Sequence, residues 1–122
     1  EMWGKDTAVA MIRPQRYTFP IVESGNSLSL SFLGEEYRNA LKLCGTLSGR
    51  DVDKFAASGL TVSQFNETPF ISEAETVLIC KKLYADYLRE NAFISEEPLS
   101  HYPTKDFHKF YICEIEKILV KE

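Results

Sequence analysis

Residues 27–32 read SLSLSF, a strict alternation of polar and apolar side chains. Because successive side chains of a β-strand point to opposite faces, this stretch predicts a strand. We expect Leu28, Leu30 and Phe32 to face a core and the serines between them to face solvent. The stretch therefore predicts a sheet strand that is buried on one side only.

Further strands are predicted on both sides of this stretch. Residues 7–12 form an apolar run, and residues 60–65, 73–88 and 108–121 are rich in β-branched and aromatic side chains. Apolar residues occupy both faces of 108–121, which is typical of a strand buried on two sides or lying at a subunit interface. Residues 89–106 contain two prolines and four acids, and predict an exposed excursion.

Three short helices are predicted between the strands. One covers 19–24 and begins after Thr18 as its N-cap. A second covers 35–43, where the apolar spacing becomes helical, and ends at Gly45. A third covers 51–55. Several strands with few short helices predict a mainly β fold, built on an antiparallel, barrel-like sheet.

Composition narrows the classes of function. The chain has 122 residues, which predicts one domain over residues 1–122. Its 14 basic and 18 acidic residues give a net charge of −4, which argues against a nucleic-acid partner. No apolar run approaches about 18 residues, so no membrane association is expected. Three cysteines without CxxC spacing, and no visible signal peptide, favour a reducing cytoplasm.

The common catalytic motifs are missing from the sequence. His101 and His108 have no metal-ligand spacing, so we interpret them as partly exposed histidines beside a strand. No GxSxG elbow, P-loop or GxGxxG motif occurs. Cys44 lies at the end of a predicted helix, where the helix dipole does not activate a thiol. We therefore predict neither a catalytic residue nor a metal site.

Two segments are suited to binding an anion. Residues 13–18, RPQRYT, place two arginines and a hydroxyl between a strand and a helix N-terminus, as a phosphate cradle requires. Residues 45–55 form a glycine-containing polar loop before a capped helix, with Arg50 and Lys54 able to face one anion. By themselves, both segments are equally well interpreted as ordinary turns with solvated charges.

Taken together and in order, these segments resemble the flavin reductase-like family, and particularly its flavoredoxin-type branch. The matching stretches are 13–19, 24–32, 35–55, 58–61 and 108–118. The resemblance implies an FMN-binding split β-barrel, a homodimer, and an FMN near the subunit interface.

The resemblance also implies which residues contact the cofactor. Arg16 and Thr18 would contact the FMN phosphate or ribityl chain, while Asp51 is the helix cap rather than a contact. The other residues expected to line the site are Arg13, Pro14 and Gln15 as its wall, Ser48, Gly49, Arg50 and Lys54 in the second loop, and Cys44, Gly45 and Thr46 beside that loop.

The sequence departs from the family pattern at two places. Cys113 stands where family members typically have glycine in the final strand. The family pattern also opens with a strand and a turn of the type N-x-M-T-x-x-W-G, and only Trp3-Gly4 resembles its end. We therefore expect this chain to lack the N-terminal strand and turn, through truncation or a disordered front segment. Such a chain would hold part of the cofactor contacts, and a sample of it would be free of FMN.

The family resemblance implies an FMN-binding oxidoreductase. It would be an NAD(P)H-dependent flavin reductase, with NADH or NADPH as electron donor, or a flavoredoxin-like protein that passes electrons through FMN to a redox partner. Because a flavin carries the electrons itself, no catalytic dyad is needed. Two alternatives stay open: a non-catalytic FMN-binding electron carrier, and a dimeric barrel module that has lost the cofactor.

Overall fold

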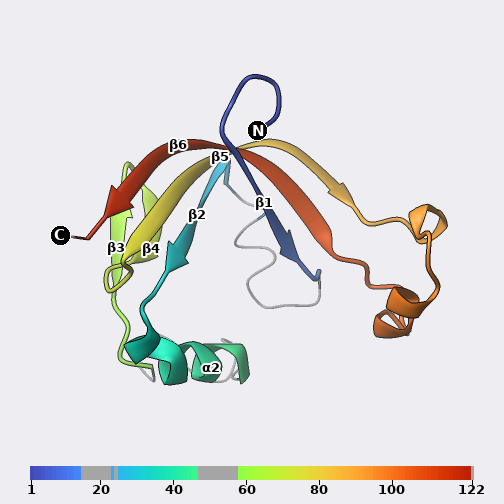
Figure 1. Cartoon of the computed structure of the whole chain (residues 1–122), viewed down its shortest axis with the longest axis horizontal. Coiled ribbons are helices and arrows are strands. Elements are labelled where there is room, and N and C mark those ends of the chain that lie inside the picture. Colours follow the sequence, from blue (N-terminus) through green and yellow to red (C-terminus); the bar gives the residue numbers. More distant parts are fainter. Residues whose placement is uncertain (15–22, 24, 47–57, 122) are drawn as a thin grey trace.

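The computed structural model describes residues 1–14, 23, 25–46 and 58–121, with residues 44–46 described as backbone only. Its main element is an antiparallel sheet of four strands in the order β1-β6-β5-β2. The long strands β5 and β6 arch over the molecule, so that the sheet is strongly curled (Figure 1). The strands are β1 (Thr7–Ile12), β2 (Ser27–Phe32), β5 (Thr76–Tyr87) and β6 (Lys109–Val120).

This architecture confirms the predicted mainly β, antiparallel fold. The strands expected at 7–12 and 27–32 begin and end where the sequence pattern places them. Two β-bulges interrupt the pairing of β5 with β6 and leave Leu83 and Glu116 without an opposite residue. Because a bulge bends a strand and increases its twist, these two contribute to the curl of the sheet.

One face of the sheet, here called the inner face, carries a cluster of completely buried side chains. These are Cys80 of β5 and Tyr111 and Cys113 of β6, each no more than 2% exposed. Leu28 and Leu30 of β2 pack against this cluster, as their alternation predicts. The inner face therefore holds one of the two buried clusters found among the described residues.

The opposite, outer face is covered at one end by a second sheet. This is a hairpin of β3 (Val62–Phe65) and β4 (Thr68–Ile71). Phe65 and Phe70 of the hairpin pack against buried Val77 and Ile79 of β5. The hairpin lies beside the arch formed by β5 and β6 (Figure 1).

The prediction that the serines of β2 face solvent is wrong. Ser29 donates to the Pro69 carbonyl of β4 at 2.6 Å, and Ser31 accepts from the Ile71 amide at 3.2 Å. The serine hydroxyls thus provide hydrogen-bond partners for backbone groups along one edge of β4. The prediction that Phe32 faces a core is also wrong, since its side chain is 55% exposed at the end of β2.

The strand predicted at 60–65 is shorter than expected, and its partner β4 was not predicted. Asn66 and Glu67 form the hairpin turn with positive φ angles of 46° and 72°. Such turns are usually signalled by Asn-Gly, and glutamate gives no such signal. Pro69 further masks β4, because proline lacks the amide that a strand donates.

The described helices are short. They are η1 (Glu35–Tyr37), α2 (Arg38–Thr46), η2 (Glu90–Ala92) and η3 (Glu97–His101). Gly45 does not end the predicted helix, since α2 continues to Thr46. The helix predicted at 51–55 lies outside the described residues, as does that at 19–24 apart from Glu23. None of the helices in the described ranges is long and apolar enough to cross a membrane.

The excursion between β5 and β6 is mostly exposed, as predicted, and contains η2 and η3. It holds a small aromatic cluster in which the ring centroid of Tyr102 lies 4.8 Å from that of Phe107 and 6.2 Å from that of Phe93. The excursion lies at the far end of the arch from the β3–β4 hairpin (Figure 1). The aromatic cluster therefore gives the excursion an apolar centre of its own.

Candidate functional site

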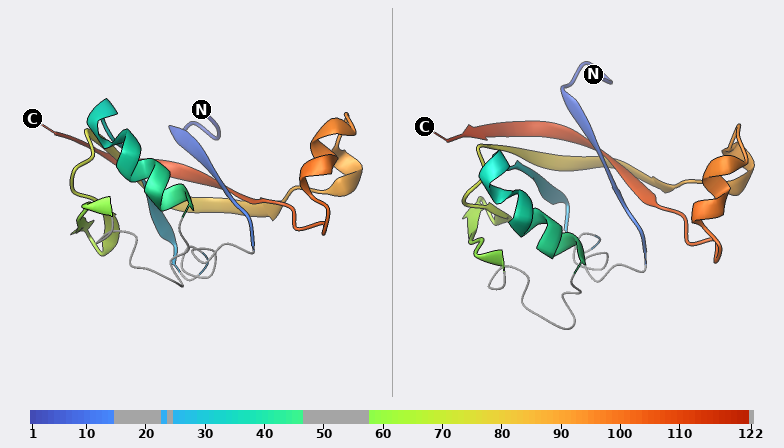
Figure 2. Two further views of the ribbon diagram at one scale, coloured as in Figure 1. Left: turned by 90° about the horizontal axis from the view of Figure 1, so that it is seen from below. Right: turned by 60° about the horizontal axis from the view of Figure 1, so that its bottom comes forward.

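The two segments predicted to bind a phosphate follow elements that end close together. Residues 13–18 follow β1, and residues 45–55 overlap and follow the last turn of α2. In both views of Figure 2 the C-terminal ends of β1 and α2 lie on the same side of the sheet. The fold therefore starts both segments from one region, although the described elements β2 and η1 lie between β1 and α2 in the sequence.

The structure describes part of the predicted residue set. Arg13 and Pro14 are described completely, and Cys44, Gly45 and Thr46 as the backbone that ends α2. The remaining predicted contacts lie outside the described residues, namely Gln15, Arg16, Thr18, Ser48, Gly49, Arg50 and Lys54. Their roles remain predictions.

Arg13 extends from the end of β1 into the excursion. Its guanidinium donates to the His101 carbonyl and lies 3.9 Å from the Asp106 carboxylate. Its Cζ lies 4.7 Å from the centroid of the Tyr102 ring, a cation–π contact. Arg13 therefore connects the start of the first predicted segment to the excursion between β5 and β6.

One donor of Arg13 suits an anionic ligand. Its Nε is buried and has no hydrogen-bond partner among the described residues. A buried N–H without an acceptor is costly, and a phosphate or carbonyl oxygen would satisfy it. The donor chemistry at this end of the sheet therefore fits the phosphate-bearing cofactor that the sequence predicts.

A second polar group lies on the inner face of the sheet. Glu23 accepts from the Lys109 ammonium at 2.6 Å and from the Tyr111 hydroxyl at 2.5 Å. The Lys82 ammonium donates to the Gly25 carbonyl at 2.6 Å and lies 5.0 Å from the centroid of the Tyr111 ring. We call Glu23, Lys82, Lys109 and Tyr111 the inner polar cluster.

The inner polar cluster shifts the titration of its members. Hydrogen bonds from Lys109 and Tyr111 lower the pKa of Glu23 below its ordinary value. Burial lowers the pKa of Lys82, and burial together with the bond to Glu23 raises the pKa of Tyr111. At neutral pH these shifts keep Glu23 as a carboxylate and Tyr111 as a neutral phenol.

Sequence reasoning missed the inner polar cluster, although one signal was available. Lys109, Tyr111 and Cys113 alternate along β6 and so share a face, and a lysine on an otherwise apolar face requires a partner. The identity of that partner is not visible locally, because Glu23 is 86 residues away from Lys109 in the chain. Only the fold brings them together.

The cysteines of the sheet are core residues. Cys80 and Cys113 are free thiols packed in the inner-face cluster. Burial raises the pKa of Cys80 to about 11 and raises that of Cys113 as well. Thiolates are the reactive form, so neither thiol is suited to nucleophilic chemistry at neutral pH. Cys113 stands where the family resemblance predicts glycine, and its side chain is buried on the inner face of the sheet.

The two histidines lie near Arg13. His108 shares a hydrogen bond of 2.6 Å between its Nδ1 and the Tyr102 hydroxyl, and His101 contributes its backbone carbonyl to Arg13. Among the residues that the structure describes, no group of three His, Cys, Asp or Glu side chains is placed to hold a metal ion.

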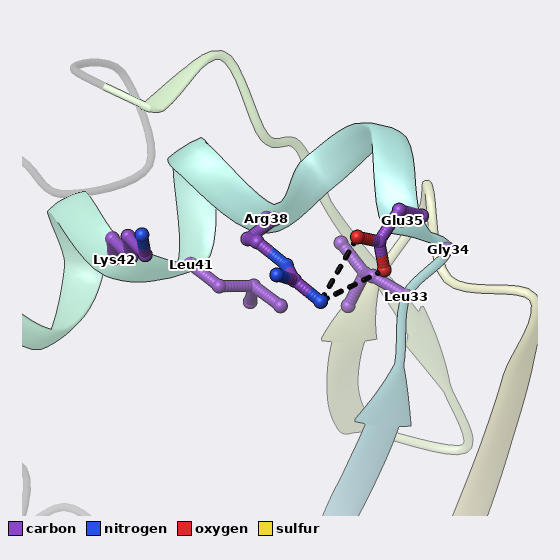
Figure 3. A pocket seen from close by; sticks show the side chains of 6 residues that line it. All are labelled: Leu33, Gly34, Glu35, Arg38, Leu41 and Lys42. Atoms are coloured by element: carbon purple, nitrogen blue, oxygen red, sulfur yellow. Dashed lines mark hydrogen bonds and ion pairs between the residues drawn. The ribbon is translucent and has the colours of Figure 1, made fainter.

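A hollow of about 430 Å³ lies beside the start of α2 (Figure 3). Arg38 forms an ion pair of 2.9 Å with Glu35 across it, and Leu41 and Leu33 supply apolar surface. Arg38 and Glu35 are both largely exposed, so their pairing stabilises the hollow only weakly. Its complete lining is Leu33, Gly34, Glu35, Arg38, Leu41 and Lys42.

Solved structures share this fold. A Shewanella frigidimarina protein described as a flavin reductase with a split barrel domain superposes with a TM-score of 0.72 and 18% identity, over 97% of this chain and 53% of that one. An FMN-binding protein of Thermus thermophilus gives a TM-score of 0.72 and 18% identity over 95% and 55%. Flavoredoxin of Desulfovibrio vulgaris gives 0.71 and 19% over 95% and 54%.

The described sheet is therefore a split β-barrel of the kind that the sequence predicts. The chain spans about half the length of these solved structures. No curated protein matches it by sequence. The flavin reductase like domain, however, matches residues 6–122. The chain thus belongs to the flavin reductase-like family.

Proposed function

We propose that the chain binds FMN and works as an oxidoreductase that passes electrons through this cofactor, as an NAD(P)H-dependent flavin reductase or a flavoredoxin-like redox protein. The observation that carries the proposal is that the two phosphate-suited segments begin in one region of the fold, at the ends of β1 and α2. Comparison with known proteins also supports the proposal, through the family match and the structural likeness to an FMN-binding protein and a flavoredoxin.

In this proposal the first segment holds the phosphate. Arg16 and Thr18 supply a guanidinium and a hydroxyl, and Arg13 and Pro14 stand where the segment leaves β1. A phosphate monoester carries between one and two negative charges at neutral pH, so more than one cation is needed to balance it. The second segment would contribute the others, through Arg50 and Lys54, with Ser48 and Gly49 as polar and backbone contacts.

When bound, FMN would accept a hydride equivalent from a nicotinamide nucleotide, and the chain would bind and orient it. The residues of the chain have three tasks: balancing the phosphate charge, holding the ring system and keeping water away from it. None of these tasks requires a protein acid or base.

Titration of the protein with FMN tests the phosphate assignment. The variant Arg16→Ala loses a charge-assisted hydrogen bond of about 1.5–3 kcal/mol, so FMN should bind about 10- to 150-fold more weakly. Arg89→Ala is the matched control, since Arg89 pairs with Asp86 at an exposed position of the excursion. Unchanged affinity of Arg16→Ala would contradict the assignment. A wild-type protein that ignores FMN would favour the cofactor-free barrel module.

Rapid mixing of the FMN-loaded protein with NADH and with NADPH separates the reductase from the electron carrier. Prompt loss of the oxidised-flavin absorbance with either nucleotide supports the reductase and identifies the donor. If neither nucleotide bleaches the flavin while a chemical reductant does, the chain is a carrier that requires a redox partner protein.

The proposal includes a homodimer. The outer face carries an apolar strip in which Val9 and Met11 of β1 and Tyr84 of β5 are 56%, 53% and 47% exposed. Phe110 and Ile112 of β6 lie between them in register, which makes the strip continuous. Contiguous exposed apolar surface is typical of association sites. Met11→Glu should therefore dissociate a dimer seen by light scattering.

The control for this experiment is Ile94→Glu, because Ile94 is fully exposed in the excursion and away from the strip. It should leave the molar mass unchanged. A wild-type protein that scatters as a monomer would contradict the homodimer.

A further inference from the structure

A second hollow, of about 310 Å³, lies where the β3–β4 hairpin meets β2. We call it the hairpin hollow. Three strands line it with uncharged side chains, namely Ser29 and Ser31 of β2, Val62 of β3, and Pro69, Phe70 and Ile71 of β4. None of these six residues belongs to the set predicted to bind a flavin. An inference about the hairpin hollow is therefore independent of the proposed function.

The hollow exists because side chains, rather than a backbone ladder, connect β2 to β4. The two strands belong to different sheets. The Ser29 hydroxyl donates to the Pro69 carbonyl, and the Ser31 hydroxyl accepts from the Ile71 amide. Strands that pair through their backbones lie about 4.8 Å apart, and a hydroxyl placed between two strands holds them further apart. The connection through serines therefore leaves room between β2 and the hairpin.

Most of the surface of the hairpin hollow is apolar. Val62 and Ile71 lie opposite each other in the register of the hairpin and so share a face. Val62 is 47% exposed, so a ligand that covers it removes apolar surface from water. Phe70 packs against a buried cluster of the sheet, which fixes the wall that it forms. The hollow is thus suited to an apolar ligand.

One polar group in the hollow remains able to donate. A serine hydroxyl has a single proton to donate and lone pairs that accept. Ser29 uses its proton on Pro69. Ser31 is an acceptor in its bond of 3.2 Å with Ile71, and its own proton has no acceptor among the described residues. Because Ser31 is partly buried, an oxygen that accepts this proton would be favourable.

We propose that the hairpin hollow binds a small neutral molecule with an apolar body and one hydrogen-bond acceptor, such as an aryl ketone. The apolar body would contact Val62 and Pro69, and the oxygen would accept from the Ser31 hydroxyl. A charged ligand is disfavoured, because it would lose water without gaining an opposite charge from the lining. The volume lies at the lower end of the range of small-molecule sites, about 300–1,000 Å³.

An NMR titration of the protein with three probes of similar size tests the proposal. Acetophenone has a ring and a carbonyl, ethylbenzene lacks the oxygen, and benzoate carries a charge. Acetophenone should shift the amide signals of Val62 and Ile71 saturably, ethylbenzene should bind about 3- to 10-fold more weakly, and benzoate should leave both signals unchanged. The proposal is overturned if acetophenone gives no saturable shift there, or if either of the other probes binds as tightly.

A variant that fills the hollow locates the site. In Val62→Trp the indole would occupy the hollow, so acetophenone should bind at least about tenfold more weakly. Ile94→Trp is the matched control, because it places the same ring at a fully exposed position of the excursion and should bind acetophenone as wild type does. Equal affinity of Val62→Trp and wild type would show that the ligand lies elsewhere.

Removal of the donor keeps the proposal testable if Val62→Trp does not fold. Ser31→Ala lacks the hydroxyl and keeps the apolar walls. Its affinity for acetophenone should fall to that for ethylbenzene, while its affinity for ethylbenzene stays at the wild-type value. A hydroxyl that only supports the hairpin would change both affinities by the same factor, and that result would overturn the role of Ser31 as donor.

Discussion

The guanidinium of Arg13 stacks on the ring of Tyr102, with 4.7 Å between its Cζ and the ring centroid. Arg13 directly follows β1, whereas Tyr102 directly follows η3 in the excursion between β5 and β6. The same arginine donates to the His101 carbonyl. These contacts connect the end of a sheet strand to a segment that is otherwise mostly exposed.

Replacing Tyr102 with leucine should therefore destabilise the protein. The change removes the cation–π contact and the bond to His108, and we expect the free energy of unfolding to fall by about 1–3 kcal/mol. Urea denaturation measures the change. Ile94→Ala is the control, because Ile94 is fully exposed in the same excursion. An equal effect of the two variants would contradict the anchoring role.

Acidification should destabilise the fold through His108. Burial, and then the nearby charge of Arg13, lower the pKa of His108 below the ordinary 6.5, while Asp106 opposes the shift. The unfolded chain then binds this proton more tightly than the folded one. The free energy of unfolding should fall as the pH drops below about 6.5, until the folded-state pKa has been passed.

Urea denaturation at several pH values between about 5 and 8 checks this expectation. In His108→Gln the slope of stability against pH should be smaller than in wild type. Ser95→Ala, which removes no titratable group, should keep the wild-type slope. The contribution of His108 would be refuted by identical slopes in wild type and His108→Gln.

Substitution of Ser31 should weaken the docking of the β3–β4 hairpin. In Ser31→Ala the Ile71 amide loses its acceptor, and the free energy of unfolding should fall by about 1–2 kcal/mol. Ser95→Ala, which removes an exposed and long bond of 3.4 Å, should cost less than about 0.5 kcal/mol. Thermal or urea unfolding compares the two. Stability of Ser31→Ala equal to that of wild type would mean that water replaces the hydroxyl.

Glycine at position 67 should stabilise the hairpin. Glu67 has a φ of 72°, a left-handed conformation that costs a residue with a side chain about 1 kcal/mol and costs glycine little. Glu67→Gly should therefore raise the unfolding temperature. Glu67→Ala keeps the strain while removing the carboxylate, so it should show no gain. If alanine stabilises as much as glycine, the carboxylate rather than the backbone is the cause.

The thiols of the inner face should resist alkylation in the folded protein. With the pKa of Cys80 raised to about 11, and that of Cys113 also raised by burial, little thiolate exists at pH 8. Iodoacetamide should label both residues in urea and neither in buffer, as read from the mass of each cysteine-containing peptide. Rapid labelling of Cys80 in the native protein would contradict its buried position.

Much of the sheet could be predicted from the sequence because strand patterns are local. The alternation in 27–32 and the apolar run 7–12 each give a strand with correct ends. The order of the phosphate-suited segments likewise sufficed to identify the family, which the match over residues 6–122 confirms. Strand β4 could not be predicted, because Glu67 and Pro69 give neither the usual turn signal nor the usual strand signal.

The sequence by itself determined the strand periods, the antiparallel β class and the family, since these depend on residues close together in the chain. Tertiary structure alone decided that the serines of β2 bond to β4, that Arg13 meets Tyr102 and that Glu23 meets Lys109. Such partners are tens of residues apart. Their meeting depends on strand order and on bulges that shift the register of β5 against β6, which no local pattern encodes.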